Sequence, residues 1–216
     1  MSFVDDILTR RSVSVVGLAK NVGKTECLNY ILRESARMGV QVGVTSIGID
    51  GESVDQVSHT PKPEIKIYDG MFFITSEKHY TEKRLTAEIL DISQNQTSLG
   101  RLVTARALSD GKVLLSGPAD TTFLKQIIRE MGRFGVDTVF VDGALSRLSL
   151  ASPAITEAMV LATGAAVSGN IQQLIRKTKY VHDLIQLGRI NDKFYNDLIN
   201  IDSGVWAIDT EGMVHD

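Results

Sequence analysis

Hydrophobic and polar positions follow two different periods along this chain. Ser12 to Val16 is an uncharged, mostly β-branched run, which is typical of a strand buried on both faces. From Lys24 onward apolar residues recur at helical spacing, and Gly39 stands where a C-terminal helix cap is expected. Val40 to Ile47 then predicts a second strand. Because such a crossover is right-handed, the two strands are expected to be parallel.

The pattern changes between residues 60 and 116, where polar and apolar residues alternate and two-residue turn signals appear. Two hairpins are predicted: residues 64–68 with 71–75 around Asp69-Gly70, and residues 99–108 with 112–115 around Asp110-Gly111. For Thr81 to Ile92 the pattern fits either a helix or a helix that runs into a strand. The sequence therefore predicts a β-rich antiparallel insertion or subdomain over residues 60–116.

After Gly117-Pro118 the alternation of helices and strands resumes. We expect a helix capped by Asp120 or Thr121, a buried strand from Thr138 that ends at Asp142, and then three more elements: a strand at residues 158–163, a long helix at about 169–187 with its apolar face inward, and a strand at 205–208. The whole chain, residues 1–216, is expected to form one α/β domain. Its predicted architecture is a mostly parallel sheet flanked by helices, as in Rossmann-like three-layer folds.

Composition narrows the possible functions. The chain has 216 residues, of which 43% are hydrophobic and 23% charged, so it can bury a substantial core. A net charge of -3 argues against nonspecific binding to nucleic acid or anionic membranes. No run is apolar enough to predict a membrane span, and the first residues do not resemble a signal peptide. Cys27 is the single cysteine, and we expect a cytoplasmic protein.

The segment GLAKNVGKT, residues 17–25, lies between the first predicted strand and the first long helix. Glycines in such a turn let backbone N–H groups converge on an anion at the positive end of a helix. Lys24 is expected to reach the β- and γ-phosphates of a nucleotide, and the Thr25 hydroxyl to ligate Mg²⁺. The other expected nucleotide-binding residues are Gly17, Asn21, Val22, Gly23 and Glu26.

A nucleotide site also needs an acid near Mg²⁺, usually at the end of a neighbouring buried strand. Asp142 closes such a strand, although an acid in this position can instead cap a turn. Asp50, followed by Glu52 and Asp55, could serve the metal or catalysis, or these acids could form a solvated turn. Arg147 could neutralise phosphate charge, although an ordinary surface arginine is the favoured interpretation. The predicted catalytic residues are thus Lys24, Asp50 and Asp142, and the predicted metal ligands are Thr25, Asp142 and Asp50.

Other chemistry receives less support from the sequence. The four histidines, His59, His79, His182 and His215, lack metal-ligand spacing and are expected at the surface. Cys27 lies on the apolar face of its helix and is expected in the core. The [NT]KxD pattern that gives guanine specificity does not occur, so ATP is favoured over GTP.

The spacing of the loop, with five residues between Gly17 and Gly23, resembles the GTDTxVGKT loop of dethiobiotin synthetase. The segment around Asp142-Gly143 is similar to the VEGAGG segment of that family, with Asp in place of Glu. This resemblance implies a SIMIBI-class P-loop NTPase that binds ATP and Mg²⁺, and a possible homodimer. The lysine that the synthetase family has at the end of the second strand is replaced here by Thr45-Ser46-Ile47-Gly48.

The stretches TSIGIDGE, TPKPEI, VDGALSR and LATGAA also resemble the small P-loop subunit of lysine 5,6-aminomutase reactivases. That resemblance implies a slow ATPase that couples nucleotide state to a protein partner, either a larger ATPase or a cobalamin-dependent mutase. Two alternatives stay open: a dethiobiotin-synthetase-like ligase or kinase that acts on a small molecule, and a binding module without hydrolysis.

Overall fold

The computed structural model of the protein describes residues 2–47, 64–118, 120–144, 155–186, 207–209 and 213–215. The chain divides into two compact units, Met1–Thr178 and Lys179–Asp216. The first unit carries the large sheet and the segments predicted to bind a nucleotide. In the second unit the described elements are the end of one helix and a small hairpin, β10 (Ala207–Ile208) with β11 (Val214–His215).

A seven-stranded sheet forms the centre of the first unit, in the order β5-β6-β4-β2-β8-β1-β9. Five neighbouring strands from β4 to β9 run parallel, whereas β6 and β5 are antiparallel additions at one edge. The strands are β1 (Ser12–Gly17), β2 (Val42–Ser46), β4 (Phe72–Ser76), β5 (Ala87–Thr97), β6 (Gly100–Ala107), β8 (Thr138–Ala144) and β9 (Ala158–Ala162). The predicted α/β class with a mostly parallel sheet is therefore confirmed.

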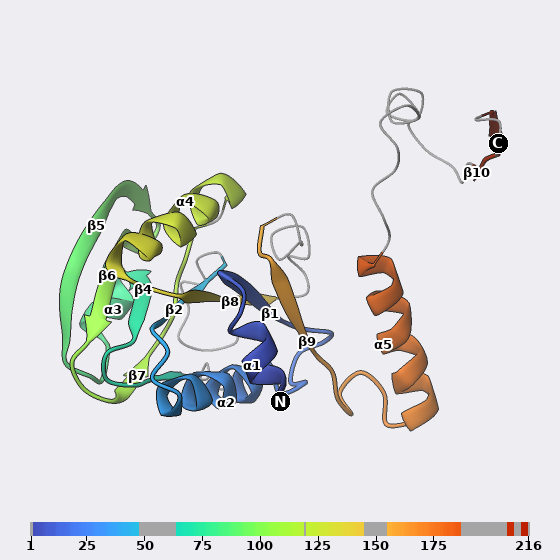
Figure 1. Ribbon diagram of the computed structural model, residues 1–216, viewed down its shortest axis with the longest axis horizontal. Helices are drawn as coiled ribbons and strands as arrows, with labels where there is room; N and C mark the ends of the chain where they lie inside the picture. The colour runs from blue at the N-terminus through green and yellow to red at the C-terminus, as the bar shows by residue number, and fades with distance from the viewer. Residues whose placement is uncertain are drawn as a thin grey trace. The chain divides into compact units, whose positions relative to one another are not determined.

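Helices cover both faces of this sheet, which gives three layers (Figure 1). On one face, α2 (Lys24–Arg37) buries Leu28, Ile31 and Leu32 in a cluster that also contains β1 and β8 side chains. On the opposite face, α4 (Thr121–Met131) buries an apolar stripe of its own in a second cluster. The Asp120 side chain accepts a hydrogen bond from the Phe123 N–H, as the predicted cap requires.

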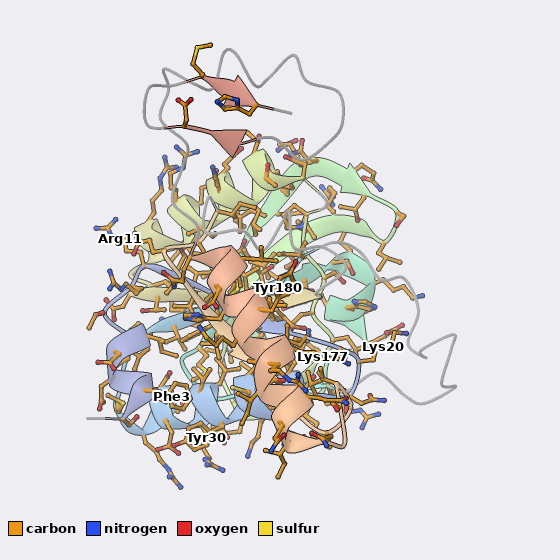
Figure 2. The ribbon with its side chains drawn as sticks, turned by 90° about the vertical axis from the view of Figure 1, so that its right-hand side faces the viewer. Phe3, Arg11, Lys20, Tyr30, Lys177 and Tyr180 are labelled. Carbon is orange, nitrogen blue, oxygen red and sulfur yellow. The ribbon has the colours of Figure 1, made fainter. Side chains whose placement is uncertain are left out.

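A short N-terminal helix, α1 (Phe3–Ile7), packs beside α2 and has no counterpart among the predicted elements. The rings of Phe3 and Tyr30 stack with their centroids 6.0 Å apart, and Figure 2 shows both side chains at the surface of this helix pair. Val4 is fully buried in the same cluster as α2. The helix therefore adds to the layer that supports β1 and the loop that follows it.

The two predicted hairpins are wrong in their pairing. β3 (Ile65–Ile67) does not pair with β4 but with β7 (Gly111–Val113), in a separate two-stranded sheet. The turn signal at Asp69-Gly70 is correct, since Gly70 has φ +80° and the Met71 N–H donates to the Tyr68 carbonyl, whereas Gly111 of the second signal is the first residue of β7. Every residue of β4 is buried, and such a strand gains more by joining the centre of a large sheet than by forming a local hairpin.

The observed hairpin joins β5 to β6 through Ser98-Leu99. For Thr81 to Ile92, which fitted either a helix or a helix that runs into a strand, the structure has the last residue of α3 (Glu77–Thr81), a connection over residues 82–86, and then the start of β5. Glu77 at the start of α3 accepts hydrogen bonds from the backbone N–H and the guanidinium of Arg101 on β6, and these bonds lower the pKa of its carboxyl. The described part of the predicted segment, residues 60–116, contains β3 to β7, of which β4, β5 and β6 extend the main sheet.

The C-terminal helix α5 (Ile171–Ile185) is present close to its predicted bounds, but its apolar face is not buried as expected. Ile171 is 73% exposed, Ile175 60% and Leu184 47%. Apolar residues at helical spacing predict the helix, but they do not specify the surface that covers it. The expectation of an inward face is therefore wrong for the described residues.

Candidate functional site

The loop between β1 and α2 places two residues in left-handed backbone conformations. Gly23 has φ +85° and Asn21 has φ +60°, and Lys24 is the first residue of the helix. Gly23 is the N-cap and offers no side-chain hydrogen bond to the helix. The first-turn N–H groups of α2, at the positive end of its dipole, are therefore not capped by a side chain at that position.

Gly17, the last residue of β1, allows the loop to fold closely over the end of the strand. A Cβ atom at this position would lie 2.8 Å from Val22 Cγ2 and 3.2 Å from the Ala19 carbonyl oxygen. The loop is further anchored to β9, because the Leu18 N–H donates to the Ala162 carbonyl at 2.9 Å. The early glycine thus serves a tight return of the chain, which a larger residue would obstruct.

Lys24 and Asp142 meet at the carboxyl end of the sheet although 118 residues separate them in the sequence. Lys24 Nζ lies 2.5 Å from Asp142 Oδ1, and the two side chains are only 24% and 18% exposed. The contact follows from the strand order, since β8 lies directly beside β1 and places Asp142 opposite Val15. Two residues predicted to share a site are therefore in direct contact.

The backbone around Asp142 is fixed by its other neighbour, β2. The Ile47 N–H donates to the Asp142 carbonyl at 3.0 Å, and the Ser46 hydroxyl donates to the same oxygen at 3.2 Å. Ser46 is a positioning residue that the sequence did not single out. The sequence offers little reason to assign Ser46 a role, because serine is common where strands end and loops begin.

The remaining predicted residues are distributed around this pair. Thr25 follows Lys24 at the start of α2, is half-buried, and its hydroxyl has no hydrogen bond to the part of the chain that the structure describes. Glu26 is exposed in the first turn of the helix, and Val22 is buried beneath the loop. Four other predicted residues, Asp50, Glu52, Asp55 and Arg147, lie outside the described residues.

A glycine that the sequence did not assign lies beside the same strand ends. A Cβ atom on Gly117 would lie 1.6 Å from the Ser46 carbonyl oxygen, so this segment packs directly against the backbone of β2. The preceding Ser116 is fully buried, and its hydroxyl lies 2.5 Å from His79 Nδ1. In the sequence, Gly117-Pro118 marks only the point after which the alternation of helices and strands resumes. In the structure, the segment around Ser116 and Gly117 connects α3 and β4 to the centre of the sheet.

His79 and Cys27 carry titratable groups, and the sequence makes a prediction about the burial of each. His79 is only 3% exposed, so the expectation of a surface histidine is wrong for this residue. Its burial follows from α3, which turns back onto β6 and carries the ring inward. Cys27 is half-buried on α2, and this burial raises the pKa of its thiol, which disfavours a nucleophilic thiolate.

The donor set at the start of α2 has the chemistry of a phosphate and Mg²⁺ site. It offers one ammonium group, first-turn amides, one hydroxyl and one carboxylate, contributed by Lys24, Thr25 and Asp142. Within the described ranges there is no cluster of three or more His, Cys, Asp or Glu residues that could hold a metal ion. A divalent cation here would thus depend on phosphate and water oxygens, which Mg²⁺ accepts readily.

Comparisons with protein-family models, curated proteins and solved structures found no match to this chain. Among the helices of the described residues, none combines the length and the apolar character needed to cross a membrane. The assignment of the candidate site therefore rests on the geometry and chemistry of its residues.

Proposed function

We propose that this protein binds ATP and Mg²⁺ at the loop between β1 and α2. The observation that carries the proposal is the ion pair between Lys24, at the first position of α2, and Asp142, near the end of the adjacent strand β8. A loop lysine at a helix N-terminus and a carboxylate on the neighbouring strand are the two charged groups that nucleotide-hydrolysing sites of this architecture need. Their contact across 118 residues supports a shared role.

Each residue has a specific part in the proposed site. Gly17 lets the loop fold closely over the end of β1, and backbone N–H groups of the loop from Ala19 to Gly23, including those of Asn21 and Val22, together with the first turn of α2 through Glu26, surround the phosphates. Lys24 turns from Asp142 to the β- and γ-phosphate oxygens. Asp142 and the Thr25 hydroxyl orient the metal, directly or through water. Bound Mg²⁺ would neutralise charge on the phosphates.

The proposed biological role is a slow, cytoplasmic ATPase that couples its nucleotide state to a protein partner. The support for it is the resemblance of several short segments to the small subunit of reactivases for cobalamin-dependent aminomutases. The proposed partner is accordingly such a mutase or a larger ATPase that acts with it. ATP is proposed over GTP because the sequence lacks the [NT]KxD pattern.

The nucleotide proposal is tested by the affinity for ATP with Mg²⁺, measured by isothermal titration calorimetry. We expect Lys24→Ala to weaken binding by more than about tenfold, since it removes a charge-assisted contact to phosphate. Lys125→Ala, which removes an exposed lysine on α4, is the matched control and should leave the affinity unchanged. Equal affinity of the Lys24→Ala variant and the native protein would overturn the proposal.

The coupling role is tested by phosphate release from ATP. We expect a low basal rate that rises when a dialysed protein fraction containing an adenosylcobalamin-dependent aminomutase is added. If small metabolites stimulate the rate and the protein fraction does not, the protein is instead a kinase or ligase of the dethiobiotin synthetase kind.

A further inference from the structure

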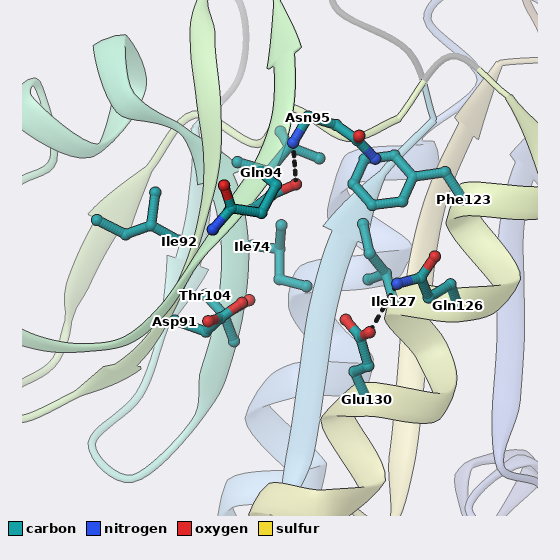
Figure 3. Close-up of a pocket in the computed structure, with 12 residues that line it drawn as sticks. Ile74, Asp91, Ile92, Gln94, Asn95, Thr104, Phe123, Gln126, Ile127 and Glu130 are labelled. Carbon is teal, nitrogen blue, oxygen red and sulfur yellow. Dashed lines mark hydrogen bonds between the residues drawn. The ribbon is translucent and has the colours of Figure 1, made fainter.

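A groove of about 350 Å³ lies between the β5–β6 hairpin and α4, on the face of the sheet that α4 covers (Figure 3). None of the residues that line it belongs to the loop between β1 and α2. Its volume falls within the range of small-molecule sites, about 300–1,000 Å³. We call it the β5–α4 groove.

The wall on the β5 side is built by irregular strand pairing. Between Ile89 and Asp91, β5 advances by two residues where β6 advances by one, from Ala105 to Thr104. Further on, β5 advances by four residues from Ile92, while β6 advances by two. Extra residues of this kind bend a strand and redirect its side chains, and they occur often beside functional sites. The redirected side chains that line the groove are those of Asp91, Ser93, Gln94 and Asn95.

The opposite wall is one face of α4. Gln126 and Ile127 each lie three or four residues from both Phe123 and Glu130, so the four residues share that face. Gln126 Nε2 donates to Glu130 Oε1 at 2.8 Å, which fixes the carboxylate at the lower end of the view in Figure 3. The helix therefore presents a positioned acid at one end of this wall and a half-buried aromatic ring at the other.

The floor of the groove is apolar and its rim is polar. Ile74, Leu102 and Ile127 are each at most 4% exposed and form the floor. The rim carries the carboxylates of Asp91 and Glu130, together with amide and hydroxyl groups, and no Lys, Arg or His belongs to the lining. The groove thus has the two features of a site for a molecule with an aliphatic body and polar ends.

The two arginines of the β5–β6 hairpin do not balance the negative charge of the groove. Arg106 Nε on β6 lies 2.5 Å from Glu88 Oε1, and Arg101 Nη2 lies 2.7 Å from Glu77 Oε1. Both arginines of this hairpin are therefore paired with acids outside the groove. The carboxylate of Asp91 has no hydrogen bond or ion pair within the described residues. An occupant with a positive charge would supply the missing partner.

We propose that the β5–α4 groove is a binding site for a small organic cation, an alkylammonium compound with a short aliphatic chain. Its ammonium group pairs with Asp91 and Glu130, and its methylene groups lie on Ile74, Leu102 and Ile127. The carboxamides of Gln94 and Asn95 accept or donate hydrogen bonds at the other end of the ligand. This site is separate from the proposed nucleotide site and does not depend on it.

The proposal is tested with 1,4-diaminobutane and its uncharged analogue 1,4-butanediol, by NMR titration of the full chain. We expect the diamine to bind at least about tenfold more tightly, because a hydrogen bond to a charged group exceeds a neutral one by that order. Its binding should shift backbone signals of β5 and α4. Equal affinity for diamine and diol, or shifts confined to other elements, would overturn the proposal.

Two conservative variants remove the charges without changing the shape of the groove. Asp91→Asn and Glu130→Gln should each weaken diamine binding by about tenfold and leave the affinity for the diol unchanged. Glu82→Gln, at an exposed acid after α3 that does not line the groove, is the matched control. If both groove variants bind the diamine as the native protein does, the assignment is wrong. Circular dichroism confirms that each variant is folded.

Discussion

At the scale of single residues, the functional proposal depends on two charges that neutralise one another in this structure. Lys24 and Asp142 are less than one quarter exposed, so their attraction is screened less than that of a surface pair. When the Lys24 ammonium group binds the phosphates of a nucleotide, the Asp142 carboxylate loses its ion-pair partner. Mg²⁺ is the natural replacement, so ATP and Mg²⁺ are expected to bind cooperatively.

This coupling predicts an unusual effect of Asp142→Asn. When Mg²⁺ is removed with EDTA, the variant should bind ATP roughly threefold to tenfold more tightly than the native protein, because Lys24 no longer has to leave an ion pair. With Mg²⁺ present, the variant should lose most of the gain in affinity that the metal gives. Calorimetric titrations with and without Mg²⁺ measure both effects.

A double-mutant cycle separates this coupling from simple repulsion between Asp142 and phosphate. In a Lys24→Ala background no ion pair exists, so Asp142→Asn should improve ATP binding by a smaller factor than it does beside Lys24. The same improvement in both backgrounds would mean that repulsion alone explains the effect, and the coupling would then be refuted.

Residue chemistry also shows what the sequence could reveal about the site. Gly17, Gly23 and Lys24 were recognisable because a strand, a glycine-led turn and an amphipathic helix follow one another within a short stretch. Asp142 was recognisable because it closes a buried strand. Ser46 and Gly117 were missed, since their importance lies in backbone atoms that pack against segments distant in the sequence.

At the scale of elements, α2 and α5 have similar apolar periodicity, but α2 buries its apolar face and α5 leaves much of its apolar face exposed. Ile31 on α2 is fully buried against the sheet, whereas Ile171 on α5 is 73% exposed. The hydrophobic effect stabilises a folded protein only where apolar area leaves water. The same substitution should therefore have very different consequences in the two helices.

We expect Ile31→Ala to lower the free energy of unfolding by about 2–5 kcal/mol, the usual cost of an isoleucine truncated in a core. Ile171→Ala should change it by less than about 0.5 kcal/mol, as is usual for exposed positions. Urea denaturation followed by circular dichroism measures both values. A large loss in Ile171→Ala would show that the α5 face is covered in solution.

At the scale of the whole molecule, the antiparallel edge and the parallel centre belong to one sheet. β4 pairs with β2 on one side and β6 on the other, so β5 and β6 are continuous with β8, the strand that carries Asp142. The segment around Gly117 strengthens this junction, because it packs against the carbonyl of Ser46 while Ser116 contacts His79. The edge and the centre are therefore expected to unfold together.

Gly117→Ala tests this junction. The new methyl group would overlap the Ser46 carbonyl oxygen, and a backbone atom has little freedom to move away, so we expect a loss of about 3 kcal/mol in unfolding free energy. Gly132→Ala is the matched control, because a Cβ atom there meets nothing within 4 Å. If urea denaturation shows equal stability for both variants, the close packing at Gly117 is not present in solution.

The sequence by itself determined most of the local elements: the buried strands, the loop with its two glycines, the long helices, and hence the α/β class. Each of these follows from periodicity and turn chemistry within a few residues. Only the tertiary structure decided that β8 lies between β1 and β2, that β3 and β4 separate into different sheets, and that α5 leaves its apolar face exposed.

The physical reason is that strand pairing is chosen by the total area buried in the folded chain, whereas turn signals act over a few residues. The contact between Lys24 and Asp142 and the β5–α4 groove are products of that long-range choice. The sequence supplies the residues of the Lys24–Asp142 contact and of the groove, but the order of the strands brings these residues together.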